Sequence, residues 1–251
     1  ILSRFTGQVQ SLISRFWHCG IYKKDTETLS AANLHFRAVK TVQEIFDNVV
    51  KTDNLIVVRF GTIQSSLGKD YHRIAGSLID AWALQKLETI AKDKNNAFEL
   101  LDVKAGNRLD LYDILLFFQF LDGKPEQPVY LNSKATYLGI ETSGRNPNLV
   151  SFGKIRSLYL KDRNLIYIIV SFKHLLSEQG IIVKSAEAFE LKDLAESDIV
   201  YNKRLNQLQL RDIFNVRLQP RTVDDFIRLI DEKFIKSRGR TEWEKEVNRF
   251  C

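Results

Sequence analysis

A turn rich in glycine and hydroxyl residues follows the strand-like segment 55–60, and its residue types suit phosphate binding. Glycine lets the backbone approach an anion closely, and the N–H groups at the start of a following helix attract negative charge. The spacing excludes a Walker A loop, because Asp70 stands where that motif needs Ser or Thr. A strand-to-helix turn with a hydroxyl N-cap is the alternative that needs no ligand. The residues expected to hold a polyphosphate are Gly61, Thr62, Ser65 and Lys69.

Two carboxylates further along the chain, Asp80 and Asp110, could bind Mg2+. This cation prefers oxygen ligands, and metal ions held by carboxylates clamp the attacking and leaving oxygens in phosphoryl-type transfers. Each carboxylate also has a plainer interpretation, as a solvated helix residue for Asp80 and as protection of an edge strand for Asp110. The four histidines have no metal-ligand spacing, and two cysteines are too few for a zinc site or a disulfide framework.

The order of these segments resembles the nucleotidyltransferase fold of poly(A) polymerases and terminal uridylyltransferases. That family shows a short strand, a Phe-Gly-Ser turn with a small-Leu-Gly element, and then Ser-Asp-x-Asp. The similar segments here, within residues 31–180, are Phe60-Gly61-Thr62, Ser66-Leu67-Gly68, Ser77-Leu78-Ile79-Asp80 and 106–111. The resemblance implies a template-independent RNA nucleotidyltransferase that uses a nucleoside triphosphate and Mg2+. In that reaction Asp80 and Asp110 would be the catalytic, metal-binding residues.

One position departs from the family pattern, because Leu78 stands where the first Asp of the Asp-x-Asp pair is expected. A single carboxylate on that strand holds Mg2+ poorly, since this cation gives up its water reluctantly. The departure leaves open a second hypothesis, a catalytically inactive protein of the same fold that binds RNA or serves as a scaffold in a larger complex. A third is a thioredoxin-like subunit that only binds, since the chain has no Cys-x-x-Cys motif.

A basic segment in the middle of the chain could hold a single nucleic-acid strand. The chain has 37 Lys and Arg against 31 Asp and Glu, and the net charge of +6 favours an anionic partner. Aromatic residues stand among the cations of this segment, and such mixtures stack bases and neutralise phosphates. The four cations are Lys154, Arg156, Lys161 and Arg163. We expect RNA as the partner and a reducing, intracellular location without a membrane, because cysteines are few and no apolar run is long enough to span a bilayer.

Hydrophobic spacing predicts the elements that would position these residues. The predicted helices are 2–16, 28–51, 77–92, the almost wholly apolar run 164–179 that ends at Gly180, and a helix that starts at the capping box of Thr222 and runs to about 236. The predicted strands are 55–60, 98–103, 109–121 and 135–142. The expected fold class is α+β. A nucleotidyltransferase-like mixed sheet flanked by helices would occupy residues 1–150, and a mainly helical domain would occupy residues 151–251.

Overall fold

The computed structural model describes residues 26–58, 71–107, 110–121, 128–139 and 146–250. Residues 35–251 form one compact unit, and residues 1–34 are grouped separately. No helix in the described ranges is long and apolar enough to cross a membrane. The helix predicted at 2–16 and the phosphate-binding turn predicted at 61–69 lie outside these ranges.

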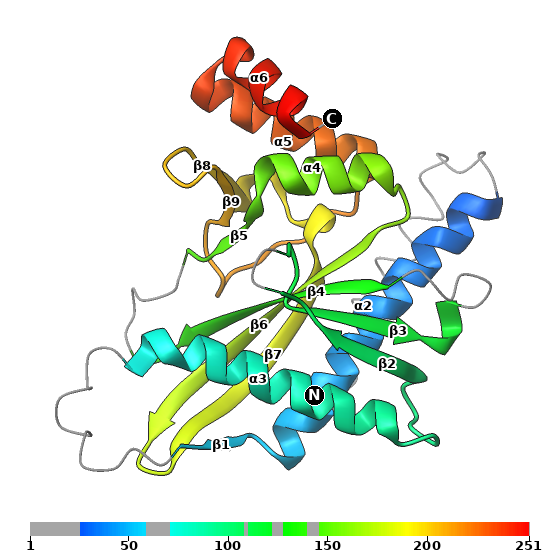
Figure 1. Cartoon of the computed structure of the whole chain (residues 1–251), viewed down its shortest axis with the longest axis vertical. Coiled ribbons are helices and arrows are strands. Elements are labelled where there is room, and N and C mark those ends of the chain that lie inside the picture. The colour runs from blue at the N-terminus through cyan, green and yellow to red at the C-terminus, as the bar shows by residue number, and fades with distance from the viewer. Residues whose placement is uncertain (1–25, 59–70, 108–109, 122–127, 140–145, 251) are drawn as a thin grey trace. The chain divides into compact units, whose positions relative to one another are not determined.

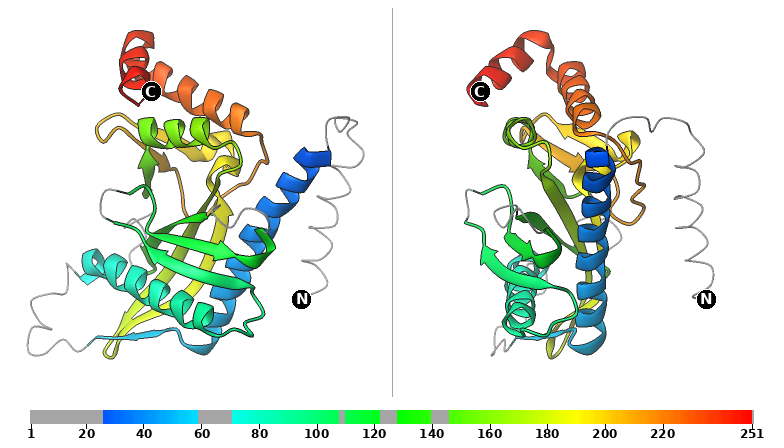
Figure 2. Two further views of the ribbon diagram at one scale, coloured as in Figure 1. Left: turned by 45° about the vertical axis from the view of Figure 1, so that its right-hand side comes forward. Right: turned by 90° about the vertical axis from the view of Figure 1, so that its right-hand side faces the viewer.

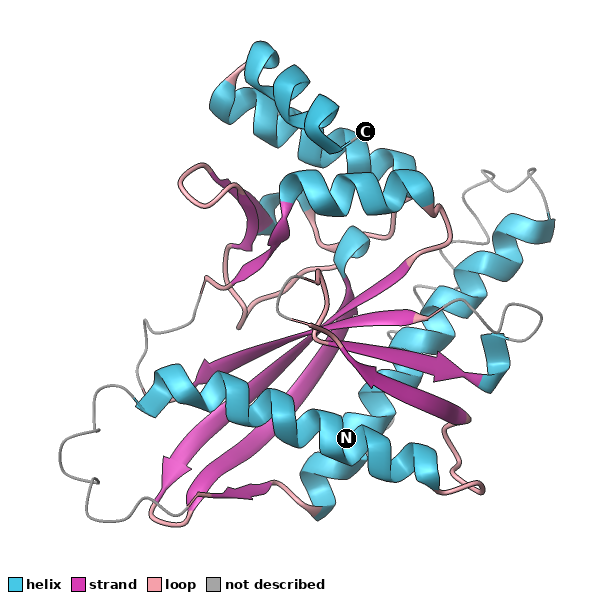
Figure 3. Ribbon diagram, in the orientation of Figure 1, coloured by secondary structure: helices cyan, strands magenta, loops and turns pink. Residues whose placement is uncertain are grey.

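A six-stranded mixed sheet forms the centre of the unit that begins at residue 35 (Figure 1, Figure 3). In spatial order the strands are β1 (Leu55–Val57), β7 (Gly180–Glu190), β6 (Ile166–Ser177), β4 (Val129–Tyr137), β3 (Ile114–Phe118) and β2 (Leu100–Ala105). β4 and β6 run parallel, whereas the other neighbours are antiparallel. A parallel pair needs a crossover connection, and here a helix lies within it.

A second, smaller antiparallel sheet has the order β5 (Asn148–Ser151), β9 (Gln207–Leu210) and β8 (Ile199–Asn202). The described helices are α2 (Thr26–Thr52), α3 (Tyr71–Lys92), α4 (Phe152–Lys161), α5 (Val223–Arg238) and α6 (Arg240–Phe250), with 3-10 turns η2 (Gln119–Leu121), η3 (Leu191–Asp193) and η4 (Glu196–Asp198). Helices α4, α5 and α6 gather beside the small sheet, and α3 lies across the large sheet (Figure 2). Two groups of helices therefore pack on different sheets, α3 on the large sheet and α4 and α5 on the small one.

Apolar side chains of β6 hold these layers together because the strand is buried on both faces. The ring of Phe172 makes edge contacts with Phe46 of α2 at 4.9 Å and with Trp82 of α3 at 5.8 Å between ring centroids. Residues Tyr167 and Ile169 instead join the apolar cluster formed by α4, α5 and the small sheet. Burying one such side chain contributes about 1.5–3 kcal/mol, so the burial of β6 stabilises the sheet that carries the site described below.

The buried helix predicted at 164–179 is wrong, because this run is strand β6. A strand covered on both faces reads as a continuous apolar run, and periodicity alone does not distinguish it from a buried helix. Gly180 does not end a helix but opens β7 with a φ of +143°, and a Cβ there would lie 2.0 Å from the carbonyl oxygen of Ile56. The mainly helical second half is also wrong, since β6, β7, β8 and β9 all lie in it.

Other predicted elements are confirmed in kind. Helix α2 covers the prediction 28–51, and α3 covers 77–92 but begins earlier. The start of α5 is confirmed at the predicted N-cap, Thr222. The hydroxyl of Thr222 accepts a hydrogen bond from the backbone N–H of Asp225 at 3.1 Å. This N-cap satisfies an N–H group that the helix itself leaves without a partner.

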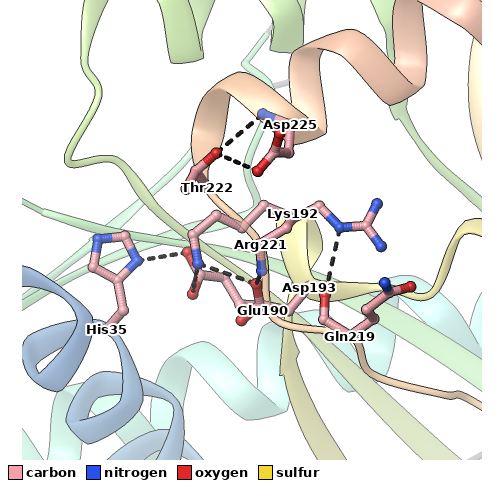
Figure 4. Close-up of polar contacts among 8 residues, drawn as sticks. All are labelled: His35, Glu190, Lys192, Asp193, Gln219, Arg221, Thr222 and Asp225. Atoms are coloured by element: carbon pink, nitrogen blue, oxygen red, sulfur yellow. Dashed lines mark hydrogen bonds and ion pairs between the residues drawn. The ribbon is translucent and has the colours of Figure 1, made fainter. Parts of the chain in front are cut away.

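A buried polar cluster ties α2 to the end of β7 and to the segment that precedes α5 (Figure 4). The carboxylate of Glu190, which is 3% exposed, accepts from His35 at 2.7 Å and from the Lys192 ammonium at 2.8 Å. Asp193 accepts a backbone hydrogen bond from Arg221 at 3.2 Å, and burial raises the pKa of its carboxyl even though Lys192 acts in the opposite direction. Buried charges are stable only when they are paired in this way.

Candidate active site

Asp113 stands at the point where β3 and β4 separate. The ladder between these strands ends with the pair of Ile114 and Leu131, and the backbone N–H of Asp113 still donates to Leu131 at 2.9 Å. Beyond that pair the Asp113 side chain supplies the hydrogen-bond acceptor that a continuing β3 would have offered to β4. Its Oδ2 accepts from the backbone N–H of Ser133 at 2.7 Å. This hydrogen bond fixes one oxygen of the carboxylate beside the middle of β4, and leaves the other oxygen for a ligand.

Helix α3 brings a second carboxylate, Asp80, to the same place. The pKa of Asp80 is raised from 3.8 to about 6, chiefly by burial and also by the negative charge of Asp113. The side chain of Ser133 and the positive charge of Lys134 act in the opposite direction. A carboxylate whose charge is disfavoured by its surroundings gains the most when a cation arrives, so the pair of carboxylates is suited to binding a metal ion.

Lys134 on β4 completes a group of three interacting charges with Asp80 and Asp113. Burial lowers the pKa of the Lys134 ammonium, while both carboxylates act to raise it. The pKa of a lysine shifts readily on burial. The result is a cation held close to two acids, with its proton bound less firmly than that of a lysine in water.

Asn132 lies two residues before Lys134 on β4, so the two side chains emerge on one face of the sheet. Its amide nitrogen donates to the carbonyl oxygen of Leu111 at 3.1 Å and to the hydroxyl of Tyr167 at 3.0 Å. Within the described ranges its amide oxygen is buried without a hydrogen-bond partner. A buried acceptor of this kind costs free energy unless a water, an ion or a substrate supplies the missing partner.

The donor set fits a divalent cation of the magnesium type. The carboxylates of Asp80 and Asp113 interact with each other, and the described ranges contain no group of three or more His, Cys, Asp or Glu that could hold an ion. Mg2+ ordinarily binds through one or two carboxylates and completes its shell with water and substrate phosphate. Asp80 and Asp113 would therefore hold the ion, and the remaining positions would be open to a phosphate group.

The metal-binding role predicted for Asp80 stays a prediction. Asp80 lies at the site, and its charged neighbours among the described residues are Asp113 and Lys134. Asp110 lies in the turn before β3, where its Oδ2 accepts from the backbone N–H of Asn107 at 2.7 Å. A role of Asp110 in binding metal stays a prediction. The residues predicted to hold a triphosphate, which are Gly61, Thr62, Ser65 and Lys69, lie outside the described residues.

The four cations predicted to bind nucleic acid lie on α4 and just after it. Arg156 pairs with Asp231 on α5 at 2.8 Å, and Arg163 pairs with Asp224 at 2.5 Å. These pairs join α4 to α5. Lys154 and Lys161 are exposed. Binding of nucleic acid by this group stays a prediction, and the two paired arginines have a structural explanation.

Sequence reasoning gave no functional role to Asn132, Lys134 or Asp113. The available signal was the polar run Asn-Ser-Lys inside an otherwise apolar segment, about twenty residues after an Asp that precedes another apolar segment. Polar residues in the middle of a buried strand are uncommon, since they cost free energy without a partner. Asn132 and Lys134 stand two positions apart on the strand, so their side chains lie on the same face of the sheet and can act on one ligand.

Three comparisons with known proteins agree with one another. The family model "Type II restriction endonuclease HpaI" matches residues 21–249. The type II restriction enzyme HpaI of Haemophilus parainfluenzae is 34% identical over 217 residues, which cover 77% of this chain and 85% of that protein. A solved structure of the NlaIV restriction endonuclease is similar in fold, with a TM-score of 0.51 and 14% identity over 83% of this chain and 87% of the other.

These findings overturn the resemblance to poly(A) polymerases and terminal uridylyltransferases, together with its fold and its RNA-directed functions. The mixed sheet and helices have the restriction endonuclease-like fold and not the nucleotidyltransferase fold. The alternative of an inactive or thioredoxin-like RNA-binding subunit falls for the same reason, as do RNA and a nucleoside triphosphate as partners. The prediction of Mg2+ is supported at the level of the family, because type II restriction endonucleases typically use it.

Proposed function

This chain belongs to the type II restriction endonuclease HpaI family, and we propose that it hydrolyses double-stranded DNA at a specific base sequence with the aid of Mg2+. The observation that supports this proposal most directly is the group formed by Asp80, Asp113 and Lys134 at the junction of β3 and β4. Two acids and a lysine around an open position provide what the hydrolysis of a phosphodiester needs. The proposal also implies an intracellular location, where the DNA is.

The reaction adds water across one P–O bond of the DNA backbone. A water molecule attacks phosphorus and loses a proton, the bond to the leaving sugar oxygen breaks, and that oxygen takes up a proton. A divalent cation, when bound, supplies charge neutralisation at the phosphate and lowers the pKa of a bound water. The protein has to hold that cation, orient the water and the phosphate, and stabilise the negative charge that develops on the phosphate oxygens.

Each residue of the group has a role that follows from its surroundings. Asp80 and Asp113 hold the cation through their carboxylate oxygens, and the hydrogen bond from Ser133 keeps the Asp113 carboxylate in place. Lys134 faces the phosphate and, when protonated, stabilises its charge. Burial of its Nζ favours the neutral amine, and in that form the nitrogen can accept the proton that the attacking water loses. The amide oxygen of Asn132, which lacks a partner in the described structure, accepts a hydrogen bond from that water.

The test uses the purified protein, bacterial genomic DNA and Mg2+. We expect a discrete set of fragments with common end sequences, and no cleavage when a chelator removes the metal. Asp113→Asn keeps an oxygen that can accept from Ser133 but loses the charge, so cleavage should fall by about 100-fold or more, as it does when other groups that stabilise the transition state are removed.

Asp102→Asn is the matched control, because it changes the same residue type at an exposed position on β2, where the carboxylate lies 3.7 Å from Lys104. If the two substitutions reduce cleavage equally, Asp113 is not the second acid of the site. If the unaltered protein leaves DNA intact with Mg2+ and with Mn2+, the proposal as a whole is wrong.

A further inference from the structure

The segment 211–217, called here the 211–217 loop, leaves β9 and leads toward α5 (Figure 1). Asp198, which is 3% exposed, holds both ends of this loop. Its carbonyl oxygen accepts from the backbone N–H of Arg211 at 2.8 Å, and its carboxylate accepts from the backbone N–H of Arg217 at 2.8 Å. The guanidinium of Arg217 adds a charged pair with the same carboxylate at 2.6 Å. One buried acid therefore fixes where the loop begins and where it ends.

The interior of the loop is equally constrained. The side chain of Ile213 is fully buried and anchors the loop in the apolar cluster of the small sheet and α5. Asp212 accepts from the backbone N–H of Phe214 at 3.0 Å through one oxygen and from the side-chain amide of Asn215 at 2.8 Å through the other. A loop held by this many contacts has one conformation before any ligand binds, so little conformational entropy is lost on binding.

The side chains that this rigid loop presents to solvent are Arg211, Asn215 and Arg217. Arginine forms two hydrogen bonds with O6 and N7 of guanine, and asparagine forms two with N6 and N7 of adenine. The contact of Asn215 with Asp212 uses one amide N–H, and leaves the other N–H and the amide oxygen to make that pair. Arg217 has its guanidinium oriented by Asp198 and by the hydroxyl of Ser197 at 2.7 Å.

The loop also lies at a suitable distance from the candidate active site. Lys134 on β4 is paired with Ser171 on β6, and Ser171 is paired with Glu187 on β7, so the three side chains form one row on one face of the sheet. Adjacent strands are about 4.8 Å apart, which puts Glu187 about 10 Å from Lys134 along this row. Glu187 and the 211–217 loop line the same open hollow, of about 630 Å3.

That separation matches the dimensions of DNA. The major groove of B-form DNA is about 12 Å wide, so a protein that holds a backbone phosphate can reach the base edges with a second element about 10–15 Å away. Contact between the loop and the sheet is direct, because the ammonium of Lys173 on β6 lies 5.7 Å from the ring centroid of Phe214. The sheet thus sets the distance between the phosphate position and the loop.

We propose that the 211–217 loop enters the major groove and reads the base sequence, with Arg211 and Asn215 in contact with base edges and Arg217 held by Asp198 as a fixed donor. This inference rests on the proposed DNA cleavage and adds to it the element that selects the sequence. The ligand class is the edge of a purine base in duplex DNA, guanine for an arginine and adenine for Asn215.

The experiment first identifies the sequence that the unaltered protein cleaves, by sequencing the ends of fragments from a genomic digest. Two duplexes are then compared, one with that sequence and one with it scrambled, for cleavage with Mg2+ and for binding with Ca2+. The variants are Arg211→Ala, Asn215→Ala and Asn215→Asp. The matched control is Arg228→Ala, since Arg228 is an exposed arginine on α5 that pairs with Asp225 at 3.4 Å on the surface.

Each loop variant should lower the ratio of specific to non-specific binding by about 5- to 160-fold, the fold-change that corresponds to losing one such base contact. Binding to the scrambled duplex should stay within about threefold, because phosphate contacts supply non-specific affinity. Asn215→Asp should also change which base is tolerated at one position of the cleaved sequence, since a carboxylate accepts from cytosine and repels the N7 of adenine. The control should retain the specificity ratio of the unaltered protein.

Two results would overturn the inference. One is an unchanged specificity ratio in both Arg211→Ala and Asn215→Ala, and the other is an equal loss of binding to both duplexes in variants whose melting temperature matches that of the unaltered protein. Failure of the proposed function looks different, because the unaltered protein would then cleave no DNA at all. A protein that cleaves a defined sequence while its loop variants cleave it just as selectively refutes the role of the loop alone.

Discussion

The carboxylate of Asp113 accepts a hydrogen bond from the backbone N–H of Ser133 at 2.7 Å, at the point where β3 leaves β4. The Asp113 side chain here accepts a hydrogen bond from β4 that a neighbouring strand would otherwise accept. Because the backbone N–H of Ser133 has a fixed direction, it sets the direction of the carboxylate as well. The acid is thus held by the sheet itself and not by a flexible loop, which is the arrangement that a precisely placed metal ligand requires.

The coupling between the two acids can be measured directly. The charge of Asp113 is one of the causes that raise the pKa of Asp80 to about 6. In Asp113→Asn this charge is absent, so the pKa of Asp80 should fall below that of the unaltered protein. Titration of the side-chain carboxyl by carbon-13 NMR without metal measures the change, and Asp110→Asn serves as the comparison. A pKa of Asp80 that is the same in Asp113→Asn would mean that the two carboxylates do not interact.

Ionisation of Asp80 should cost stability in the metal-free protein. Its pKa in the folded state is about 6, above the ordinary value of 3.8, so its contribution to stability is complete below pH 3.8 and is lost as the pH rises through 6. At pH 8, Asp80→Asn should therefore raise the free energy of unfolding, by at most about 3 kcal/mol for a shift of this size. Urea unfolding at pH 8 and at pH 5 gives the comparison. An Asp80→Asn variant that is less stable than the original at pH 8 would contradict the assignment.

Lys134 should be needed for the reaction but not for the fold. In Lys134→Gln the half-buried side chain keeps its length approximately and loses its charge, so we expect cleavage to fall by about 100-fold or more while binding of DNA with Ca2+ remains. Lys104→Gln is the control, because Lys104 is an exposed lysine on β2 whose carboxylate partner, Asp102, lies 3.7 Å away. Single-turnover cleavage rates separate the two. Equal rates for Lys134→Gln and the control would remove Lys134 from the site.

The acid that holds the 211–217 loop should also stabilise the fold. Burial acts to raise the pKa of Asp198, but the hydrogen bonds from Arg217 outweigh it and leave the pKa below 3.8. The stability from this pair is therefore present above pH 3.8 and is lost as the pH falls through the lower value of the folded state. Asp198→Asn should cost about 1.5–3 kcal/mol at pH 7, as hydrogen bonds to charged groups do.

Urea unfolding at pH 7 measures the free energy of unfolding of Asp198→Asn and of a control, Asp102→Asn. The control should lose little stability, since surface pairs contribute about 0–1 kcal/mol. A loss of stability in Asp198→Asn no larger than in Asp102→Asn would show that the pair with Arg217 contributes little. The loop would then lack the rigidity on which its proposed role in reading bases depends.

How much could be predicted from the sequence depended on whether a pattern was local. The N-cap of Thr222 and the helices around Val42 and Ala83 were predictable, because capping and helical periodicity act over a few residues. Strand β6 was not, since an apolar run covered on both faces has no periodicity of its own. Of the candidate site, only Asp80 was named in a metal-binding role. Its neighbours Asp113 and Lys134 come close to it through the pairing of β3 with β4 and the packing of α3, which no spacing in the sequence reveals.

The edge strand β1 has a consequence for the life of the protein in a cell. Leu55 lies opposite Ile182 of β7, so an early segment of the chain finds its partner only after most of the sheet has been synthesised. Phe46 and Trp82 likewise wait for Phe172. Contacts so distant in sequence form late, so the packing of α2 and α3 on the sheet cannot be complete in a growing chain before β6 and β7 are present. A chain made in this order can complete the sheet that carries its candidate active site only after β7 has been synthesised.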